Sequence, residues 1–423
     1  MADRPNVVLL SIDALRADHL SCHGYERETT PVIDSLAEEN AWFKRAYSSS
    51  SHTREAVPSL LTGRYPDEFA DHGYSLFGDS IGEMLQENGY ETAGFHSNPY
   101  ISRAYGFGDG FDTFDDDLYL GDSKLLALGQ RLFDKLRNRH YARAETINER
   151  ALDWLDQQNG EPFFLWNHYM DVHGPYQPPK RFRNEFINDS ISNRESKRLY
   201  RRSVDDPESI TEEERELQQA LYDAENRYVD KQIGDFLAAL KQRDHLEDTL
   251  LILTADHGDA FGERGYYGHP RKVDEELLHV PLLVRGEGVP ESTIDVPAGT
   301  LDIVPTILEE VGAEYDLPGR PLQHLWTEPD EYTDRYVFSE ATGINNSERL
   351  FRATGTEGHC LARANLKAKS ITSSSCEGIE AESTLTQFVQ KRLDEEVAVT
   401  PADDDMAEGA VEGRLEALGY KKK

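Results

Sequence analysis

Cationic residues are scarce in this sequence. The chain of 423 residues carries 45 Lys and Arg against 79 Asp and Glu, a formal net charge of −34, and lysine is rarer than arginine. Such a surface repels the phosphates of nucleic acid, so we expect no nucleic-acid partner. An acidic surface with few lysines is typical of proteins from a high-salt cytoplasm, where salt screens the self-repulsion. We therefore interpret the chain as halophilic, with an ordinary acidic enzyme as the alternative.

Cysteine and long apolar runs are also scarce. The cysteines, Cys22, Cys360 and Cys376, follow no CxxC or framework spacing, which favours a reducing compartment. No run approaches the roughly 18 apolar residues that a membrane span needs, and no signal-like segment precedes the first predicted strand. We therefore expect a cytoplasmic protein without a membrane span. Hydrophobic residues still make up 38% of the chain, enough for a sizeable core.

Apolar runs of strand length alternate with helical patterns over most of the chain. The predicted strands are 6–12, 91–96, 162–168, 249–255 and 280–284, and the predicted helices are 31–37, 58–63, 80–88, 144–158, 220–240 and 300–308. The segment 118–158 is mainly helical in pattern, and 184–216 is charged and weakly periodic, which indicates a surface excursion. This alternation predicts an α/β fold with a mainly parallel sheet covered on both faces.

The pattern changes beyond residue 325. Short β-like pieces at 336–340 and 350–354 are followed by a tail helix at 411–418. We therefore expect a main domain at 1–325 and a smaller C-terminal α+β subdomain with a tail helix at 326–423.

Two predicted strands end in potential metal ligands. The run 249–255 leads into Asp256 and His257, with Gly258 allowing a sharp turn, and the run 6–12 leads into Asp13. In open α/β sheets, ligands collect beyond the carboxyl ends of the strands. Two carboxylates and an imidazole suit a borderline divalent ion, whereas an all-oxygen shell would indicate calcium or magnesium alone. Taken singly, each residue also fits a structural role as a helix cap or a packed histidine.

A polar loop supplies hydroxyl groups. Residues 48–54 are Ser, His, Thr and Arg, and they lead into a short predicted helix that ends near Gly63. A hydroxyl group at such a junction faces the positive end of the helix dipole, which stabilises an alkoxide or a bound anion.

Several of these segments resemble motifs of the sulfatase family. Residues 5–20 resemble its first metal motif, 60–66 the end of its nucleophile signature, and 173–176 its substrate-binding histidine motif. Its second metal segment is similar to 254–259 with 262–263 and 268–269, and further matches lie at 275–282 and 302–306. The matches cover roughly residues 5–325 in the family's order. The resemblance implies an alkaline-phosphatase-like fold, with helices on both faces of the sheet, and a metal-dependent hydrolase of a small anionic ester.

The resemblance also implies roles for individual residues. One divalent metal ion (Ca²⁺, or Mn²⁺, Zn²⁺ or Mg²⁺) is expected on Asp13, Asp256, His257 and the hydroxyl of Thr53. His173 and His269 are expected to orient the ester oxygens or to protonate the leaving group. The predicted substrate-binding residues are Arg54, Asn98 and Lys272.

The chain departs from the family at the nucleophile. Counting back from Thr62, the nucleophile position falls on Thr53, where sulfatases carry the cysteine or serine that is oxidised to formylglycine. Threonine cannot give that aldehyde, so no formylglycine is expected. The proline, serine and arginine that normally follow are replaced by residues 55–57, and Val57 in particular removes an anion-binding charge. The second aspartate of the opening pair is Ala14.

A threonine nucleophile changes the expected chemistry. Its alkoxide forms a threonine ester, which water must then cleave at phosphorus or sulfur, and a metal ion would lower the pKa of the hydroxyl. Members of the wider superfamily with this nucleophile act on phosphate or phosphonate esters. We therefore predict a hydrolase of sulfuric or phosphoric mono- or diesters or of phosphonates. The alternatives are a phospho-group transferase acting on a glycan or lipid and a catalytically silent anion-binding relative, and the oligomeric state stays open.

Overall fold

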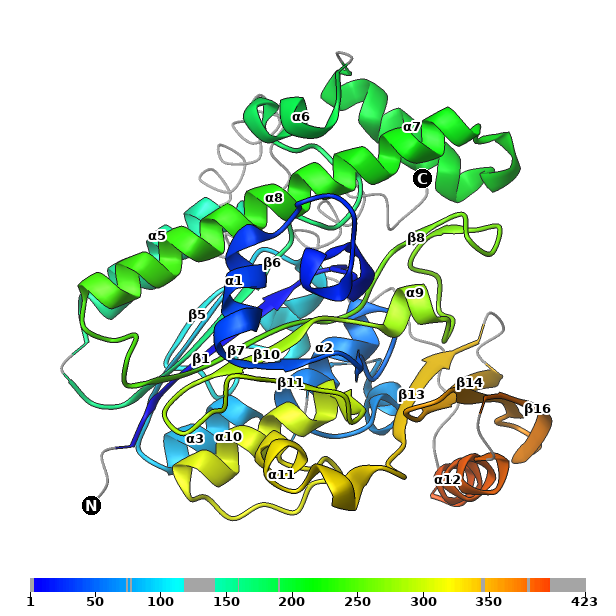
Figure 1. Ribbon diagram of the computed structural model, residues 1–423. Coiled ribbons are helices and arrows are strands. Elements are labelled where there is room, and N and C mark those ends of the chain that lie inside the picture. The colour runs from blue at the N-terminus through cyan, green and yellow to red at the C-terminus, as the bar shows by residue number, and fades with distance from the viewer. Residues whose placement is uncertain are drawn as a thin grey trace.

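An eight-stranded sheet forms the centre of the molecule (Figure 1). The computed structural model describes residues 4–73, 75–76, 78–117, 141–158, 160–188, 191–343, 347–378 and 381–395. In order across the sheet, the strands are β11 (Ser292–Ile294), β2 (Ala41–Phe43), β10 (Leu282–Arg285), β7 (Thr249–Ala255), β1 (Asn6–Ile12), β6 (Phe163–Tyr169), β4 (Glu91–Phe95) and β5 (Thr113–Asp115). The five strands from β7 to β5 are parallel, whereas β10 runs antiparallel to both its neighbours.

Helices cover both faces of this sheet. Alternate residues of β1 enter different cores: Val8 and Leu10 pack in one, Val7 and Leu9 in the other. The first core lies under α1 (Pro31–Glu39), α5 (Ala144–Leu155) and α8 (Glu212–Gln242), and the second under α2 (Thr53–Thr62), α3 (Ile81–Glu87), α10 (Ile303–Val311) and α11 (Leu322–Thr327) (Figure 1). The predicted fold class is confirmed, since the sheet is mainly parallel and helices enclose it.

Helix α1 begins at Pro31 as predicted, but its N-terminus is capped by another helix. The Thr30 hydroxyl makes no cap and lies 3.3 Å from a carboxylate oxygen of Asp34. Instead, Asp230 on α8 accepts the backbone N–H groups of Val32 at 3.0 Å and Ile33 at 2.8 Å. A cap supplied from about 200 residues away leaves no local signal in the sequence.

The segment 184–216, predicted as a charged surface excursion, is mostly helical and largely exposed. It contains the end of α6 (Lys180–Phe186), all of α7 (Asn193–Asp205) and the start of α8. Capping boxes begin α7 at Ser192 and α8 at Thr211, each with a Glu three residues on. Leu199 is the one large apolar residue that α7 buries, so the helical period was hidden among charges.

A smaller antiparallel sheet follows α11. Its strands, in order, are β13 (Val337–Thr342), β14 (Glu348–Thr354), β15 (His359–Asn365) and β16 (Ser370–Glu377), and α12 (Glu382–Asp394) packs on it. Strand β13 contacts the polar loop before α2: the N–H of Glu340 donates to the carbonyl oxygen of Ser49 at 2.9 Å, and the Ser339 hydroxyl to that of Ser48 at 2.6 Å. The boundary at residue 325 stays a prediction. The predicted tail helix at 411–418 and the helical pattern at 118–140 lie outside the described residues.

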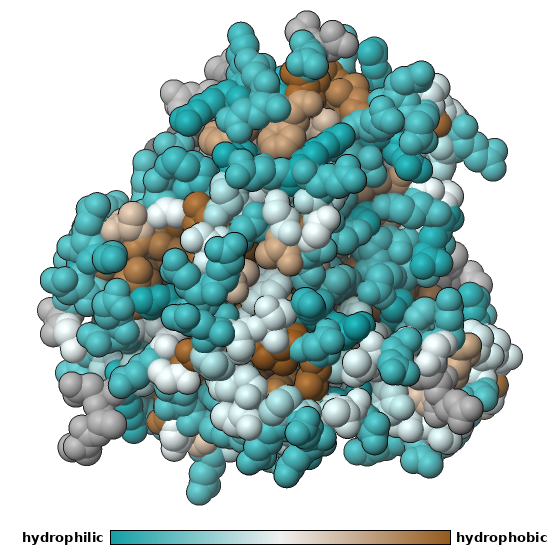
Figure 2. Space-filling view, in the orientation of Figure 1, coloured by the Kyte–Doolittle hydropathy of each residue, from teal (hydrophilic) through white to brown (hydrophobic). Residues whose placement is uncertain are grey.

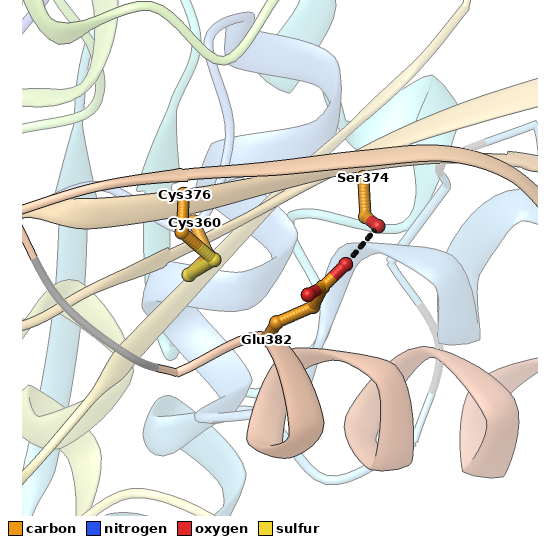
Figure 3. The surroundings of a disulfide bond; sticks show 4 residues. All are labelled: Cys360, Ser374, Cys376 and Glu382. Atoms are coloured by element: carbon orange, nitrogen blue, oxygen red, sulfur yellow. Dashed lines mark hydrogen bonds between the residues drawn. A yellow bond between two sulfur atoms is a disulfide. The ribbon is translucent and has the colours of Figure 1, made fainter.

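Two of the three cysteines form a disulfide, although their spacing matches no cysteine motif. Cys360 on β15 lies directly opposite Cys376 on β16, and the two form a disulfide (Figure 3). Close by, the Ser374 hydroxyl donates to Glu382 at the start of α12. Antiparallel pairing brings together residues 16 apart in the sequence, which no cysteine motif announces. The cysteine pattern therefore gives no support to a reducing compartment.

The surface is largely hydrophilic on the face shown in Figure 2. Among the described residues, Val204 is the one large hydrophobic side chain that is exposed. Across the same residues, every helix is too short or too polar to cross a bilayer.

Removal of the α1 cap should destabilise the protein. We expect Asp230→Ala to lower the free energy of unfolding by about 1–3 kcal/mol, because two N–H groups at the start of α1 lose their acceptor. Thr30→Ala is the matched control, and its effect should be less than half as large because its hydroxyl makes no cap. Urea unfolding measures both, and equal losses would contradict the assignment of the cap to Asp230.

Candidate metal centre and nucleophile

Polar side chains gather at the carboxyl ends of four neighbouring strands, β7, β1, β6 and β4. Asp13 follows β1 directly, Asp256 follows β7, and His168 is the penultimate residue of β6. Asn98, shortly after β4, donates its amide N–H to Asp13 Oδ2 at 2.7 Å. Parallel pairing places these strand ends in register, with Ser11 opposite both His168 and residue 254. This edge of the sheet is where α/β folds place their ligands.

Two buried carboxylates form the centre of the site. Asp13 is fully buried and Asp256 is 1% exposed, and together with His168 they can point one ligand atom each into a group within 4.8 Å. Asp13 Oδ1, Asp256 Oδ2 and His168 Nε2 are buried and have no hydrogen-bond partner within the described residues. Unpartnered buried carboxylate oxygens are costly, and a bound cation would compensate them. The residues therefore fit a divalent metal ion.

The ionisation of the two carboxylates is coupled. Burial opposes charge on Asp13, but the neighbouring imidazoles of His173, His168 and His257 hold its pKa below the usual range. Burial and the charge of Asp13 raise the pKa of Asp256. Two carboxylates at this distance cannot both stay charged without a cation or a proton between them.

His257 points its free lone pair at the carboxylates. Its Nδ1 lies 2.8 Å from the carbonyl oxygen of Gly258, which can only accept, so Nδ1 donates and, in the neutral imidazole, Nε2 carries the lone pair. Nε2 lies 3.7 Å from Asp13 Oδ1 and 3.6 Å from Asp256 Oδ2. Ligand atoms about 2.0–2.4 Å from a shared ion are separated by such distances, so His257 can join the metal shell.

Gly258 is required for close approach rather than for an unusual φ angle. A Cβ atom at this position would lie 2.2 Å from the carbonyl oxygen of Glu276. Its φ lies outside the left-handed region, so the sharp turn expected from sequence is not what requires a glycine here.

Ala14 holds the backbone between the two carboxylates in a left-handed conformation, with φ of +62°. Its N–H donates to Asp256 Oδ1 at 3.2 Å, and its carbonyl oxygen accepts the Tyr222 hydroxyl at 2.8 Å. Asp and Asn adopt this φ more readily than Ala. The aspartate of the related family would suit the backbone and add a ligand, whereas Ala14 leaves one fewer carboxylate. Asp18 is 54% exposed and paired with Arg16, so it lies away from the centre.

Thr53 is the first residue of α2, and its hydroxyl faces the centre. It is 1% exposed, and its Oγ1 lies 3.1 Å from His257 Nε2. With the Nε2 lone pair available, the Thr53 hydroxyl donates to it. The positive end of α2 also lies at this position, which favours negative charge on the oxygen.

Glu55, two residues after Thr53 on α2, links this helix to the polar loop and to β13. Its carboxylate accepts the Ser50 hydroxyl at 2.9 Å and the N–H of Thr342 on β13 at 3.3 Å, and it pairs with Arg271 at 3.0 Å. The residue that replaces the family's proline therefore anchors the loop that carries Thr53.

The histidine pair, His173 and His269, lies beside these residues. Their Nε2 atoms are 3.3 Å apart, and the His269 ring lies 4.6 Å from that of His257. His173 Nδ1 donates to the carbonyl oxygen of Gly174 at 2.6 Å, and burial lowers the pKa of His173 to about 4. Burial also opposes charge on His269, but a 3.2 Å hydrogen bond to the carboxylate of Asp259 raises its pKa above the usual value. The raised pKa favours the imidazolium form of His269, which can donate from Nε2 to the Nε2 of His173.

The predicted substrate-binding residues take different positions. Asn98 contacts Asp13, as described above. Arg54 donates to the carbonyl oxygen of Gly73 at 2.9 Å and stacks over the Tyr100 ring. The Lys272 ammonium lies 3.9 Å from the centre of the Tyr266 ring. Val57, at the family's arginine position, is buried in the second core. The substrate-binding roles of Arg54, Asn98 and Lys272 stay predictions.

Sequence reasoning missed two histidines at the site. His168 lies in the predicted strand 162–168, whose apolar pattern gives no separate signal for a metal ligand. Its place near the end of a strand, like that of the other candidate ligands, is the signal that could have found it. His52 caps α2 by accepting the N–H of Arg54 at 3.3 Å, and its ring lies 5.5 Å from that of His269. The spacing of the nucleophile motif identifies Thr53 as a candidate but carries no signal for its neighbour His52.

Comparisons with known proteins agree on one family. The family model described as Sulfatase matches residues 5–313. The chain is 26% identical over 354 residues to the uncharacterized sulfatase YidJ of Escherichia coli, covering 75% of this chain and 70% of that protein. It is 24% identical over 396 residues to an arylsulfatase of Clostridium perfringens, covering 80% and 81%.

Two solved structures show the same fold. The phosphonate monoester hydrolase of Agrobacterium radiobacter has a TM-score of 0.70 at 20% identity, covering 98% of this chain and 95% of that one. A structure of BT4656 with D-glucosamine-2-N,6-O-disulfate has a TM-score of 0.69 at 17% identity, covering 95% and 100%.

Metal binding should depend on the buried carboxylates. We expect Ca²⁺ or Mn²⁺ at about 100 times its dissociation constant to stabilise the parent by about 2.7 kcal/mol, and a chelator to reverse this. Asp256→Asn should abolish most of the shift while leaving the metal-free protein as stable as the parent or more so, because a buried repulsion is removed. Asp18→Asn removes a carboxylate that is 54% exposed and paired with Arg16, and it should keep the full shift. Thermal unfolding with and without metal measures all three, and an undiminished shift in Asp256→Asn would exclude this centre.

Proposed function

The chain belongs to the sulfatase family, and on that premise we propose that it is a metal-dependent hydrolase of phosphoric, phosphonic or sulfuric esters with Thr53 as its nucleophile. The observation that carries the proposal is the 3.1 Å contact between Thr53 Oγ1 and His257 Nε2, at the point where Nε2 also faces Asp13 and Asp256. Residues from the ends of two strands and the start of one helix thereby surround one small volume.

The metal ligands in this proposal are Asp13, Asp256, His257 and the Thr53 hydroxyl, with His168 as a further candidate. When bound, the cation lowers the pKa of the hydroxyl and offsets negative charge on the transferring group. The hydroxyl of Thr53 would lose its proton to water, and its Oγ then attacks the phosphorus or sulfur as an alkoxide while the ester oxygen leaves; the positive end of α2 stabilises the charge on Oγ.

The leaving group needs a proton. His269 carries one, because Asp259 holds its imidazolium, and the neutral His173 keeps the His269 ring in position through the 3.3 Å contact. Transfer of this proton to the ester oxygen releases the alcohol and leaves a threonine ester. A water molecule then cleaves that ester at phosphorus or sulfur, with His269 as the base that takes its proton.

The threonine favours phosphoryl over sulfuryl transfer. A formylglycine hydrate expels sulfate by collapsing to its aldehyde, whereas a threonine ester has no such route and depends on attack by water. The sulfatase-family relatives keep sulfate esters within the proposal. A panel of aryl sulfate, phosphate mono- and diester and phosphonate substrates with Mn²⁺, Zn²⁺ and Ca²⁺ at high salt decides between them.

A catalytically silent relative is the second candidate, because Ala14 and Val57 each remove a charged group expected in the family. It would bind phosphate or sulfate tightly and turn over no member of the panel. Transfer of a phospho group to a glycan or lipid would appear as product formation only when such an acceptor is added.

Thr53→Ala should abolish turnover. We expect kcat to fall by about 10³-fold or more, since no other hydroxyl replaces the nucleophile. The metal-induced shift in unfolding temperature should persist, because the carboxylates remain. Thr53→Ser keeps a hydroxyl and should retain measurable activity, which separates loss of the nucleophile from loss of packing. Parent-like rates in Thr53→Ala would reject the assigned nucleophile.

His269→Gln should affect poor leaving groups most. For alkyl esters, which need the proton, we expect kcat to fall by about 10²–10⁴-fold, and the loss for 4-nitrophenyl esters should be much smaller. Asp259→Asn should show the same pattern more weakly, because it only weakens the charge on His269. Kinetics across a series of leaving-group pKa values measures both, and a uniform loss would argue against a proton donor.

A further inference from the structure

Helix α7 lies against the two loops that carry the histidine pair. A Cβ atom added to Gly174 would lie 2.2 Å from Cε2 of Tyr200, so the loop after the first histidine touches the phenol ring. One added to Gly268, just before the second histidine, would lie 3.4 Å from Val204 and 3.5 Å from the Tyr200 hydroxyl. The helix that sequence patterns failed to reveal is therefore a wall of the candidate site.

This helix is cationic in a strongly anionic protein. Its 13 residues, NRESKRLYRRSVD, contain five cationic and two anionic side chains, in a chain of net charge −34. Arg202 pairs with Glu214 on α8. Within the described part of the chain, no carboxylate lies at ion-pairing distance from Arg194, Arg198 or Arg201. Like charges on neighbouring helical turns repel one another, so the cluster opposes the folding of α7 rather than favouring it.

Part of the positive charge lies on the face that is turned toward the site. Lys197 precedes Tyr200 by one helical turn, and Val204 follows it by one, so the three share a face. Arg201 lies one turn after Lys197 and is exposed, whereas Lys197 is half-buried. Because Lys197 and Arg201 are four residues apart on α7, their side chains are neighbours, and burial and the charge of Arg201 lower the pKa of Lys197.

We propose that Lys197 and Arg201 on α7 bind a second anionic group of the substrate, a carboxylate, sulfate or phosphate that is separate from the ester being cleaved. The proposal rests on the function proposed above and names its substrate class: an ester that carries a further negative charge on its leaving group. A chain of net charge −34 repels such a molecule at most of its surface. A local cationic wall beside the site reverses this repulsion where the substrate enters.

The test compares matched esters with and without the second charge. The probes are phenyl phosphate and its 3- and 4-carboxyphenyl analogues, with the corresponding sulfates, at one fixed salt concentration because salt screens the interaction. For the more active of the two carboxyphenyl esters, we expect the parent's kcat/KM to exceed that for the phenyl ester by about tenfold, as two ion pairs near the surface would give. In Lys197→Glu/Arg201→Glu this ratio should fall to one or below.

A control variant separates the local effect from net charge. Lys241→Glu/Lys367→Glu changes the net charge by the same amount at exposed positions on α8 and the β15–β16 turn, and it should keep the parent's ratio. If Lys197→Glu impairs folding, Arg198→Glu/Arg201→Glu replaces it, since both positions are exposed. No preference in the parent, or an equal preference in the α7 variant, would overturn the proposal.

A binding measurement keeps this result distinct from the proposed function. Calorimetry of the same probes with Thr53→Ala, which should not cleave them, reports affinity without turnover. If the carboxylated probe binds more tightly to the parent surface and this preference disappears in the α7 variant, the anion-binding role of Lys197 and Arg201 is supported. If no ester is hydrolysed in the same experiments, only the proposed function fails. Equal affinities for both probes count against the wall, whatever the activity.

Discussion

Two carboxylates buried at the carboxyl edge of a parallel sheet constrain the residues around them. Asp13 and Asp256 are shielded from water, and one oxygen of each has no hydrogen-bond partner among the described residues. A cation compensates such a pair, and histidines and a hydroxyl group lie around it at distances that suit a shared ion. Burying these two charges costs free energy, and contacts from other parts of the chain hold this edge of the sheet in place.

The supporting contacts come from distant parts of the chain. Tyr222 on α8 and the Asp256 carboxylate hold the left-handed backbone of Ala14. Glu55 ties the nucleophile loop to β13 of the small sheet. Helix α7 packs against the loops of the histidine pair and carries five cationic side chains in a protein of net charge −34. The C-terminal sheet and the charged insertion therefore both contribute to the site, although neither supplies a metal ligand.

Local patterns predicted most of the large sheet and its helices. The strands β1, β6 and β7 are continuous apolar runs because both faces of the sheet are covered, and such runs are easily recognised. Helix α7 was missed because Leu199 is its single large buried apolar residue, so its period was hidden, although the capping box at Ser192 offered a signal. The Cys360–Cys376 disulfide was missed because its spacing reflects strand register rather than a cysteine motif.

The sequence alone determined that two strands end in carboxylates and that Thr53 stands where the resemblance to the sulfatase motif predicts a nucleophile. These facts depend on residues that are neighbours in the chain, where apolar runs and motif spacing carry the information. Only the tertiary structure decided that His168 joins the carboxylates, that Asn98 donates to Asp13, and that α7 lies against the histidine pair. Each of these is a contact across 80 or more residues or between separate elements, set by sheet order and helix packing, and no local pattern encodes it.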